Sequence, residues 1–209
     1  MRRVALLVTE DIQMRIALTI DTEFPDRPWH NDHAQQDAYT ILSALREYDA
    51  PATFFVQGRW AEAHPTLVRD ISREHTIGSH TYSHNENQNL TREELTWEIR
   101  KTEEILTSLT GQPVRPYFRS PYGHGTPLMN DVLEKLGYQD IGWDWTPRDW
   151  LPMDMQTYIE QWRTGLVPGI ALIHSWPTCT VTGLRTCLSL SRAVGGEFVS
   201  LEEWLHGTT

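Results

Sequence analysis

Two histidines that could share one metal ion stand four residues apart, His80 and His84. On a helical turn this spacing places two side chains on one face, so both imidazoles could reach the same ion. The pair alone is a weak signal, because the chain holds nine histidines. The signal becomes stronger only if carboxylates and other polar residues stand at positions that the fold would bring close to the two histidines.

Further polar residues stand at or shortly after the ends of apolar segments that are typical of buried strands. In chain order these residues are Asp21, Arg119, Asp149 and His174. In a parallel barrel the carboxyl ends of all strands gather at one face, and active sites are built there. We therefore expect these four residues to meet His80 and His84 at that face.

The elements that must position these residues alternate between strands and helices. Apolar runs rich in strand-forming residues predict strands at 15–21, 53–56 and 169–173. Further strands are predicted at 117–119 and 139–145. Apolar residues at helical spacing predict helices at 34–49, 65–73, 91–110, 126–136, 154–164 and 184–193. This alternation predicts an α/β fold with a parallel sheet, either closed into a barrel or open and doubly wound.

The helix expected after residue 90 has the clearest ends in the chain. Thr91 and Glu94 form a capping box, in which each side chain binds the backbone N–H of the other residue. Gly111 stands where the helix should stop, since glycine adopts the left-handed conformation that ends many helices.

Charge and hydropathy exclude several classes of partner. The formal charge of −10 argues against binding to nucleic acid or to an anionic membrane, both of which need a basic surface. No run approaches the roughly 20 apolar residues of a membrane span. We see no glycine-rich phosphate loop, which weakens a nucleotide-binding interpretation. Two cysteines, Cys179 and Cys187, are too few for a disulfide framework, and whether they pair stays open.

The first residues resemble a signal peptide only in part. Two arginines precede a run of five apolar residues, 4–8, which Thr9 and Glu10 then interrupt, and no small-residue cleavage site follows. We therefore expect an unexported, cytoplasmic protein. Its length favours one domain, with residues 1–14 as an extension and 15–209 as the folded unit.

Assembled in order, these pieces resemble the polysaccharide deacetylase family, also called NodB-homology domains or carbohydrate esterase family 4. Five short motifs carry the resemblance: T-I-D-T-E at 19–23, H-T-Y-S-H at 80–84, R-S-P-Y-G at 119–123, D-W at 149–150 and L-I-H at 172–174. The resemblance implies a distorted (β/α) barrel of seven or eight mostly parallel strands in a single domain.

The resemblance also implies a metal centre and a general base. His80 and His84, with a carboxylate from the first motif, would bind one divalent ion, with Zn²⁺ expected and Co²⁺, Ni²⁺ or Mn²⁺ as alternatives. Such an ion activates a water molecule and polarises the substrate carbonyl. Asp21 would be the general base, and Arg119 would hold it in place.

The remaining motifs imply an acid and a substrate pocket. His174 would protonate the leaving group, oriented by Asp149. The backbone N–H of Tyr122 would stabilise the oxyanion, and Trp150 would wall the acyl pocket. Two further candidate substrate contacts are Ser120, within the third motif, and Trp176, two residues after the last motif.

The first motif departs from the family pattern. Thr22 stands where the family has a second aspartate, so another carboxylate must complete the metal site. Glu23 is the first choice, because side chains two apart on a strand point to the same side. Asp26 is the fallback. The following loop, 24–33, lacks the usual Gly-Pro and carries His30 and His33 instead, which leaves the substrate open.

Several functions remain compatible with these residues. The leading hypothesis is a metal-dependent hydrolase that removes acetyl groups from an N-acetylated or O-acetylated sugar. A second is a C–N hydrolase acting on a small cyclic amide or ureide, as in allantoinase-like relatives. A third is a catalytically inactive barrel that only binds glycan, which Thr22 would favour. A remote fourth is a non-haem iron oxygenase, since two histidines and a carboxylate also form its metal site.

Overall fold

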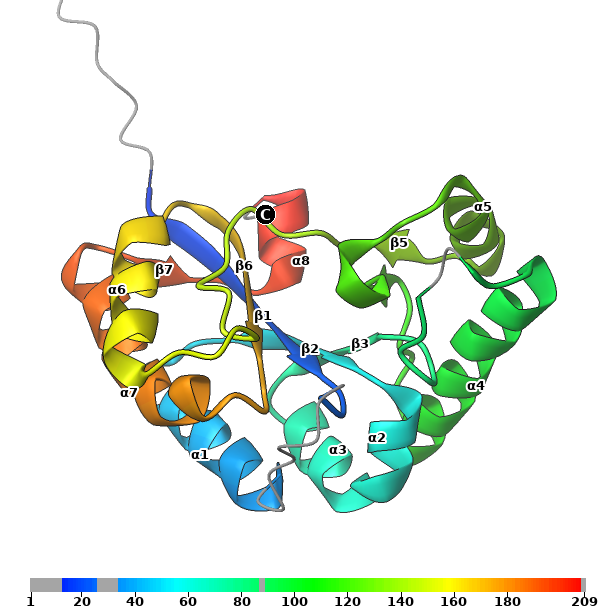
Figure 1. The fold of residues 1–209 in the computed structure, drawn as a ribbon, viewed down its shortest axis with the longest axis horizontal. Helices are drawn as coiled ribbons and strands as arrows, with labels where there is room; N and C mark the ends of the chain where they lie inside the picture. Colours follow the sequence, from blue (N-terminus) through cyan, green and yellow to red (C-terminus); the bar gives the residue numbers. More distant parts are fainter. Residues whose placement is uncertain (1–12, 26–33, 87–88, 208–209) are drawn as a thin grey trace, which may run out of the picture.

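A curled seven-stranded sheet forms the centre of the computed structural model, which describes residues 13–25, 34–86 and 89–207 (Figure 1). Its strands are β1 (Arg15–Thr22), β2 (Ala52–Val56), β3 (Thr76–Ser79), β4 (Tyr117–Phe118), β5 (Gln139–Asp140), β6 (Gly169–His174) and β7 (Glu197–Phe198). They pair in the order β5-β4-β3-β2-β1-β6, with β7 also on β1. Every pairing is parallel, as the alternation of elements predicts.

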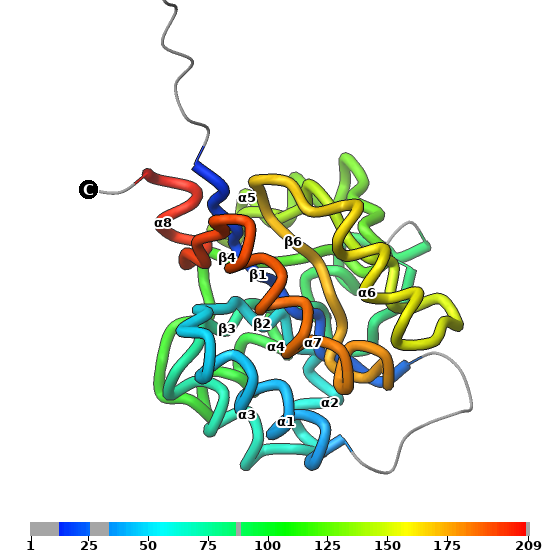
Figure 2. The backbone as a smooth tube through the Cα atoms, turned by 90° about the vertical axis from the view of Figure 1, so that its left-hand side faces the viewer, coloured from blue at the N-terminus to red at the C-terminus, as the bar shows by residue number. Residues whose placement is uncertain are grey.

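Strand β1 is the axis of the fold. It lies between β2 and β6, and all but its first residue are buried, as expected of a strand covered on both faces. Figures 1 and 2 both show β6 beside β1. The register of this pair sets Asp21 opposite His174, so the two residues reach the same edge of the sheet together.

The segment predicted as one strand at 139–145 is different. Only its first two residues form β5, beside β4. The chain then crosses to the far edge, where Trp145 forms a bridge with Ala171 of β6. Between these points Arg119 binds two carbonyls that a strand would offer to its neighbour, Ile141 O (2.9 Å) and Gly142 O (3.0 Å). This crossing curls the sheet toward a barrel.

The helices form a belt around the outside of the sheet. They are α1 (Ala34–Glu47), α2 (Gly58–Ala63), α3 (Pro65–Ser72), α4 (Arg92–Thr110), α5 (Pro127–Leu136), α6 (Met155–Gly165), α7 (Thr178–Ala193) and α8 (Leu201–His206). Along the belt α6 packs on α7, α7 on α1, α1 on α3, α3 on α4 and α4 on α5. Figure 1 shows its two ends, α6 and α5, on opposite sides of the sheet.

Most helix ends agree with the sequence prediction. Thr91 and Glu94 form the expected capping box, and Gly111 ends α4 at φ 69°. Helix α7 begins at Thr178 rather than at 184, and the short helices α2 and α8 were not predicted. Both cysteines, Cys179 and Cys187, are buried and unpaired. In the part of the chain that the structure describes, no helix has the length and apolarity that crossing a membrane requires.

Candidate active site

A pocket of about 370 Å³ opens at the carboxyl ends of the strands. Eight of the residues selected from the sequence line it: Asp21, Glu23, His80, His84, Tyr122, Trp150, His174 and Trp176. Arg119 and Asp149 are almost fully buried behind this lining, each bonded to one of its members. Residues predicted to lie in the rim loop, Asp26, His30 and His33, fall outside the described residues.

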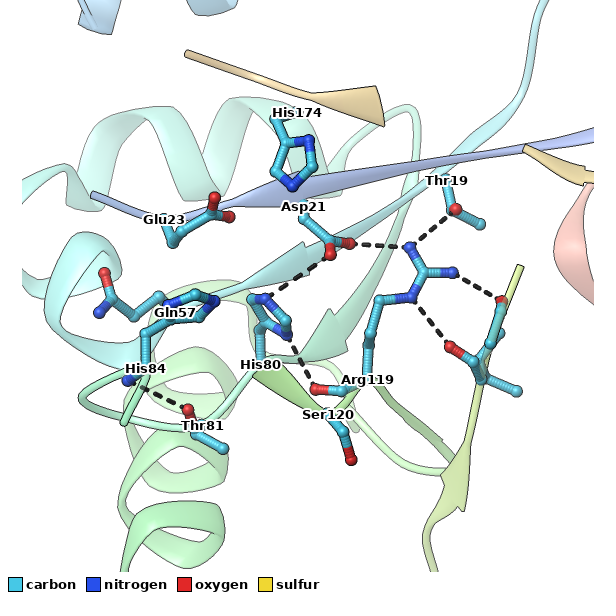
Figure 3. Close-up of polar contacts among 12 residues, drawn as sticks. Thr19, Asp21, Glu23, Gln57, His80, Thr81, His84, Arg119, Ser120 and His174 are labelled. Carbon is cyan, nitrogen blue, oxygen red and sulfur yellow. Dashed lines mark hydrogen bonds and ion pairs between the residues drawn. The ribbon is translucent and has the colours of Figure 1, made fainter. Parts of the chain in front are cut away.

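Asp21 and Arg119 form a buried pair at the floor of the pocket (Figure 3). Arg119 Nη1 donates to Asp21 Oδ1 (2.8 Å) and to Thr19 Oγ1 (2.8 Å), and its guanidinium stacks on the Phe55 ring at 4.2 Å. Burial would raise the pKa of Asp21, but the charge of Arg119 and the neighbouring imidazoles outweigh it and lower the pKa. Asp21 is therefore an anion whose second oxygen, Oδ2, is left to face the pocket.

His80 and His84 converge, although not on a helical turn as predicted. Strand β3 ends at Ser79, and the chain then runs through an irregular loop in which Thr81 and His84 have φ near 60°. The two imidazole rings still lie 4.9 Å apart. The hydroxyl of Thr81 accepts the His84 N–H (3.2 Å), which closes the loop (Figure 3).

Hydrogen bonding fixes how His80 faces the pocket. Its Nδ1 lies 2.8 Å from the carbonyl oxygen of Arg119, which only accepts, so Nδ1 carries the proton. Its Nε2 is then a lone-pair donor, 3.6 Å from Asp21 Oδ2 (Figure 3). Burial lowers the pKa of His80, and burial is also the main cause that lowers the pKa of His84 to about 3. Both imidazoles are thus neutral, the form that binds metal ions.

Glu23 is the second carboxylate of the pocket. It faces the same side of the chain as Asp21, whereas Thr22 does not line the pocket. Trp176 Nε1–H donates to Glu23 Oε1 (2.6 Å). Among the described residues the buried Oε2 has no hydrogen-bond partner. Burial is the main cause that raises the pKa of Glu23 to about 7, and a cation beside the carboxylate would stabilise its ionised form.

His174 and Asp149 form the second buried dyad. The Asp149 carboxylate accepts from both the backbone N–H and the Nδ1–H of His174, each at 2.8 Å. Thr180 Oγ1 donates to the same carboxylate (2.6 Å), a contact that no sequence signal indicated. Burial would lower the pKa of His174, but the anionic Asp149 overrides it and raises the pKa to about 9. His174 therefore holds a proton at neutral pH.

The predicted substrate contacts divide into two groups. Trp150 and Trp176 both lie next to His174, with ring centroids 5.5 and 5.6 Å from its ring. Tyr122 is 44% exposed at the rim, with φ 57°. Ser120, in contrast, is buried and its hydroxyl donates to Asp140 Oδ2 (2.7 Å), so the structure does not bring it into the pocket.

The side chains that line the pocket are of the chemical types that bind a divalent ion. As arranged across 13–25, 34–86 and 89–207, no three His, Cys, Asp or Glu side chains lie close enough together to hold an ion. Two neutral imidazoles and two carboxylates nevertheless line one pocket, and one of those carboxylates has a buried, unpartnered oxygen at Glu23 Oε2. Imidazole nitrogen and carboxylate oxygen are the ligands of catalytic zinc.

Comparison with known proteins identifies the family. The sequence pattern of the family described as polysaccharide deacetylase matches residues 10–141, more than half of the chain. The chain belongs to the polysaccharide deacetylase family.

Two relatives of the chain are named as deacetylases of amino-sugar polymers or oligomers. The chain is 32% identical over 136 residues to a chitooligosaccharide deacetylase of Azorhizobium caulinodans, which covers 64% of this chain and 65% of the relative. It is 30% identical over 184 residues to a peptidoglycan-N-acetylglucosamine deacetylase of Bacillus cereus, covering 84% and 85%. The chain thus spans about two thirds of the first relative's length.

Solved structures place the fold in carbohydrate esterase family 4. A peptidoglycan N-acetylglucosamine deacetylase structure superposes with a TM-score of 0.80 at 28% identity, over 95% of this chain and 90% of that one. A family 4 pseudoenzyme from Bacillus anthracis has a TM-score of 0.80 at 23% identity, over 93% and 66%. The distorted (β/α) barrel predicted from the sequence is confirmed. Because the fold also occurs in a pseudoenzyme, activity must be argued from the residues of this chain.

Proposed function

We propose that this chain is a metal-dependent hydrolase that removes the acetyl group from an N-acetylated sugar. The observation that carries the proposal is the meeting of two buried pairs at one pocket, on adjacent strands: Asp21 held by Arg119, and His174 held by Asp149. A base and an acid whose environments push their pKa values apart are what hydrolysis of an amide needs. The names of the relatives support an N-acetylated sugar as the substrate class.

In this mechanism Asp21 Oδ2 accepts the proton of the attacking water, while Arg119 keeps Oδ1 in place. His174 then donates its proton from Nε2 to the leaving nitrogen, since its Nδ1 is bound to Asp149. A divalent ion, held by His80, His84 and Glu23, would polarise the acetyl carbonyl and acidify the water.

Aromatic residues would bind the sugar. The indoles of Trp150 and Trp176 line the pocket beside His174, where they would contact a sugar whose amide nitrogen reaches the acid. The backbone N–H of Tyr122 is the proposed donor to the oxyanion. Leu172 and Trp150 line the same pocket and would surround the acetyl methyl group.

A glycan-binding barrel without activity is the second candidate. The observation in its favour is Thr22, which cannot supply the charge of the aspartate that it replaces. A protein that only binds glycan, however, does not need the two buried pairs Asp21–Arg119 and His174–Asp149, which provide an anionic base and a protonated acid. Turnover of an acetylated glycan separates the two candidates.

Removal of metal is expected to abolish activity. The purified protein should hold about one divalent ion per chain, and exhaustive chelation should stop the release of acetate from N-acetylated chitooligosaccharides and peptidoglycan fragments. Metal analysis together with an acetate assay checks this, and Zn²⁺ or Co²⁺ should restore the rate. A cyclic ureide is assayed in parallel, because hydrolysis of a ureide in place of the acetylated sugars would favour the alternative C–N hydrolase. Full activity in a sample with no detectable metal contradicts the mechanism.

Asp149→Asn is expected to move the alkaline limb of the pH profile to lower pH. The limb reports loss of the His174 proton, and the anionic Asp149 is what raises that pKa to about 9. An asparagine still accepts hydrogen bonds but carries no charge, so His174 loses its proton earlier as pH rises. Profiles of kcat/KM against pH for the parent and the variant measure the shift. Asp140→Asn, which alters a carboxylate outside the pocket, should leave the limb in place.

A further inference from the structure

The loop that carries the two histidines is strained and needs support from outside. Thr81 and His84 adopt left-handed backbone conformations, with φ 59° and 61°. Residues other than glycine adopt this region only at a cost in free energy, and they keep it when their surroundings hold them there. What holds the backbone of Tyr82 and Ser83 therefore determines where both imidazoles point.

The carbonyl groups of the loop are bound by the first turn of α2. Thr81 O accepts from the N–H of Gly58 (2.9 Å), and Tyr82 O accepts from the N–H of Arg59 (3.0 Å). The contact is close, since a Cβ on Gly58 would lie 2.8 Å from the Tyr82 ring and 3.1 Å from its Cα. On this side, therefore, backbone N–H groups bind the carbonyl groups of the loop, and the Tyr82 hydroxyl also donates to Glu62 Oε2 (3.0 Å).

The N–H groups on the other side of the loop converge on one carboxylate, that of Glu98 in α4. Glu98 Oε2 accepts from the N–H of Tyr82 and from the N–H of Ser83, each at 2.8 Å. Glu98 Oε1 accepts from the Ser83 hydroxyl at 2.6 Å. Glu98 is only 5% exposed, and three charge-assisted hydrogen bonds to one loop compensate its burial.

We propose that Glu98 is a positioning residue for the metal centre: its carboxylate holds the loop between His80 and His84 in the shape that brings both imidazoles to the pocket. The sequence analysis did not single out this residue, which lies fourteen positions beyond His84 on a helix that contributes nothing else to the site. The metal part of this inference rests on the proposed function, whereas the loop geometry does not. Groups that hydrogen-bond directly to metal ligands tune metal affinity by about 10- to 100-fold. Glu98 acts through the backbone between the two ligands, and we expect an effect in the same range.

The chain offers variants that separate this role from general support of α4. Glu98→Ala removes all three acceptors, and Glu98→Asp keeps the charge but shortens its reach by one methylene. Glu98→Gln is the matched rescue, because its carbonyl oxygen accepts both N–H groups while its NH₂ donates to the Ser83 hydroxyl. Glu104→Ala, on the exposed side of the same helix, is the control.

The experiment measures two quantities on the purified full chain. Titration of the metal-free protein with Zn²⁺ gives the dissociation constant, which should rise about 10- to 100-fold in Glu98→Ala and Glu98→Asp. It should stay close to the parent value in Glu98→Gln and Glu104→Ala. Hydrogen exchange of the peptide containing residues 80–84, followed without metal, should accelerate in the first two variants only.

Two results overturn the proposal. One is a folded Glu98→Ala or Glu98→Asp protein that binds Zn²⁺ as tightly as the parent and exchanges residues 80–84 no faster. The other is a Glu98→Gln protein that binds Zn²⁺ as weakly, and exchanges residues 80–84 as fast, as Glu98→Ala. If Glu98→Ala does not fold, Glu98→Gln is compared with Glu98→Asp instead. A parent protein that binds no Zn²⁺ refutes the proposed function instead, and the exchange data then judge the positioning role alone.

Discussion

Asp21→Asn is expected to lower kcat by about 10²- to 10⁴-fold, the range for a positioned proton-transfer group. Asparagine fills the same space and its oxygen still accepts from Arg119, but it takes no proton from water. Because Asp21 is assigned as the base and not as an essential ligand, bound metal should survive the change. Acetate release and metal content, measured on one preparation, test both halves of this expectation.

A control on the same strand separates loss of the base from disturbance of Arg119. Thr19 also accepts from Arg119 Nη1 but does not line the pocket. Thr19→Val therefore removes one hydrogen bond of Arg119 and leaves the base in place, so its kcat should fall far less. If Asp21→Asn keeps near-normal turnover, the base must be another group.

The parts of the fold that local sequence determines were predicted correctly. Strand β1 was recognised because a strand covered on both faces is apolar throughout. The capping box at Thr91 and the glycine at 111 fixed the ends of α4, because both signals act within one helical turn. The meeting of Asp21 and His174 followed from parallel pairing, which brings strand ends to one edge.

The loop between the two histidines shows where local sequence is insufficient. A spacing of four residues fits a helical turn, yet here the conformation is imposed by partners far along the chain, the N–H groups of Gly58 and Arg59 and the carboxylate of Glu98. The imidazoles converge for a reason that the spacing does not contain. The same spacing therefore predicts correctly that the two imidazoles converge, and predicts the wrong local structure.

Long-range polar contacts also explain the two other differences. A full strand is predicted at 139–145, but the Arg119 side chain binds the carbonyl groups of Ile141 and Gly142, which are then not available to a neighbouring strand. Ser120 looked available for substrate because it neighbours Arg119, whereas its hydroxyl is bound by Asp140, twenty residues away. Neither competing partner is visible from spacing along the sequence.

Glu23→Ala is expected to lose most bound metal and most activity together. Two neutral imidazoles leave the full +2 charge of an ion uncompensated, so an anionic oxygen is strongly favoured as the third ligand. Glu23 reaches the pocket, is held at Oε1 by Trp176 and keeps Oε2 unbonded among the described residues. Removing a ligand should weaken Zn²⁺ binding by roughly 10²-fold or more, because even the loss of a group that only hydrogen-bonds to a ligand lowers metal affinity by about 10- to 100-fold. Titration with Zn²⁺ measures the loss.

The neighbouring residue is the matched control for this assignment. Thr22 occupies the family's aspartate position, but it is buried outside the pocket and its hydroxyl has no hydrogen-bond partner in the described part of the chain. Thr22→Ala should therefore keep both metal and activity, although it changes the residue nearest to the family pattern. Asp26→Ala tests the fallback carboxylate in the same titration. The assignment of Glu23 is wrong if Glu23→Ala binds Zn²⁺ normally and either Thr22→Ala or Asp26→Ala loses the metal. Removal of the anionic ligand must weaken Zn²⁺ binding, so the variant that loses the metal identifies that ligand.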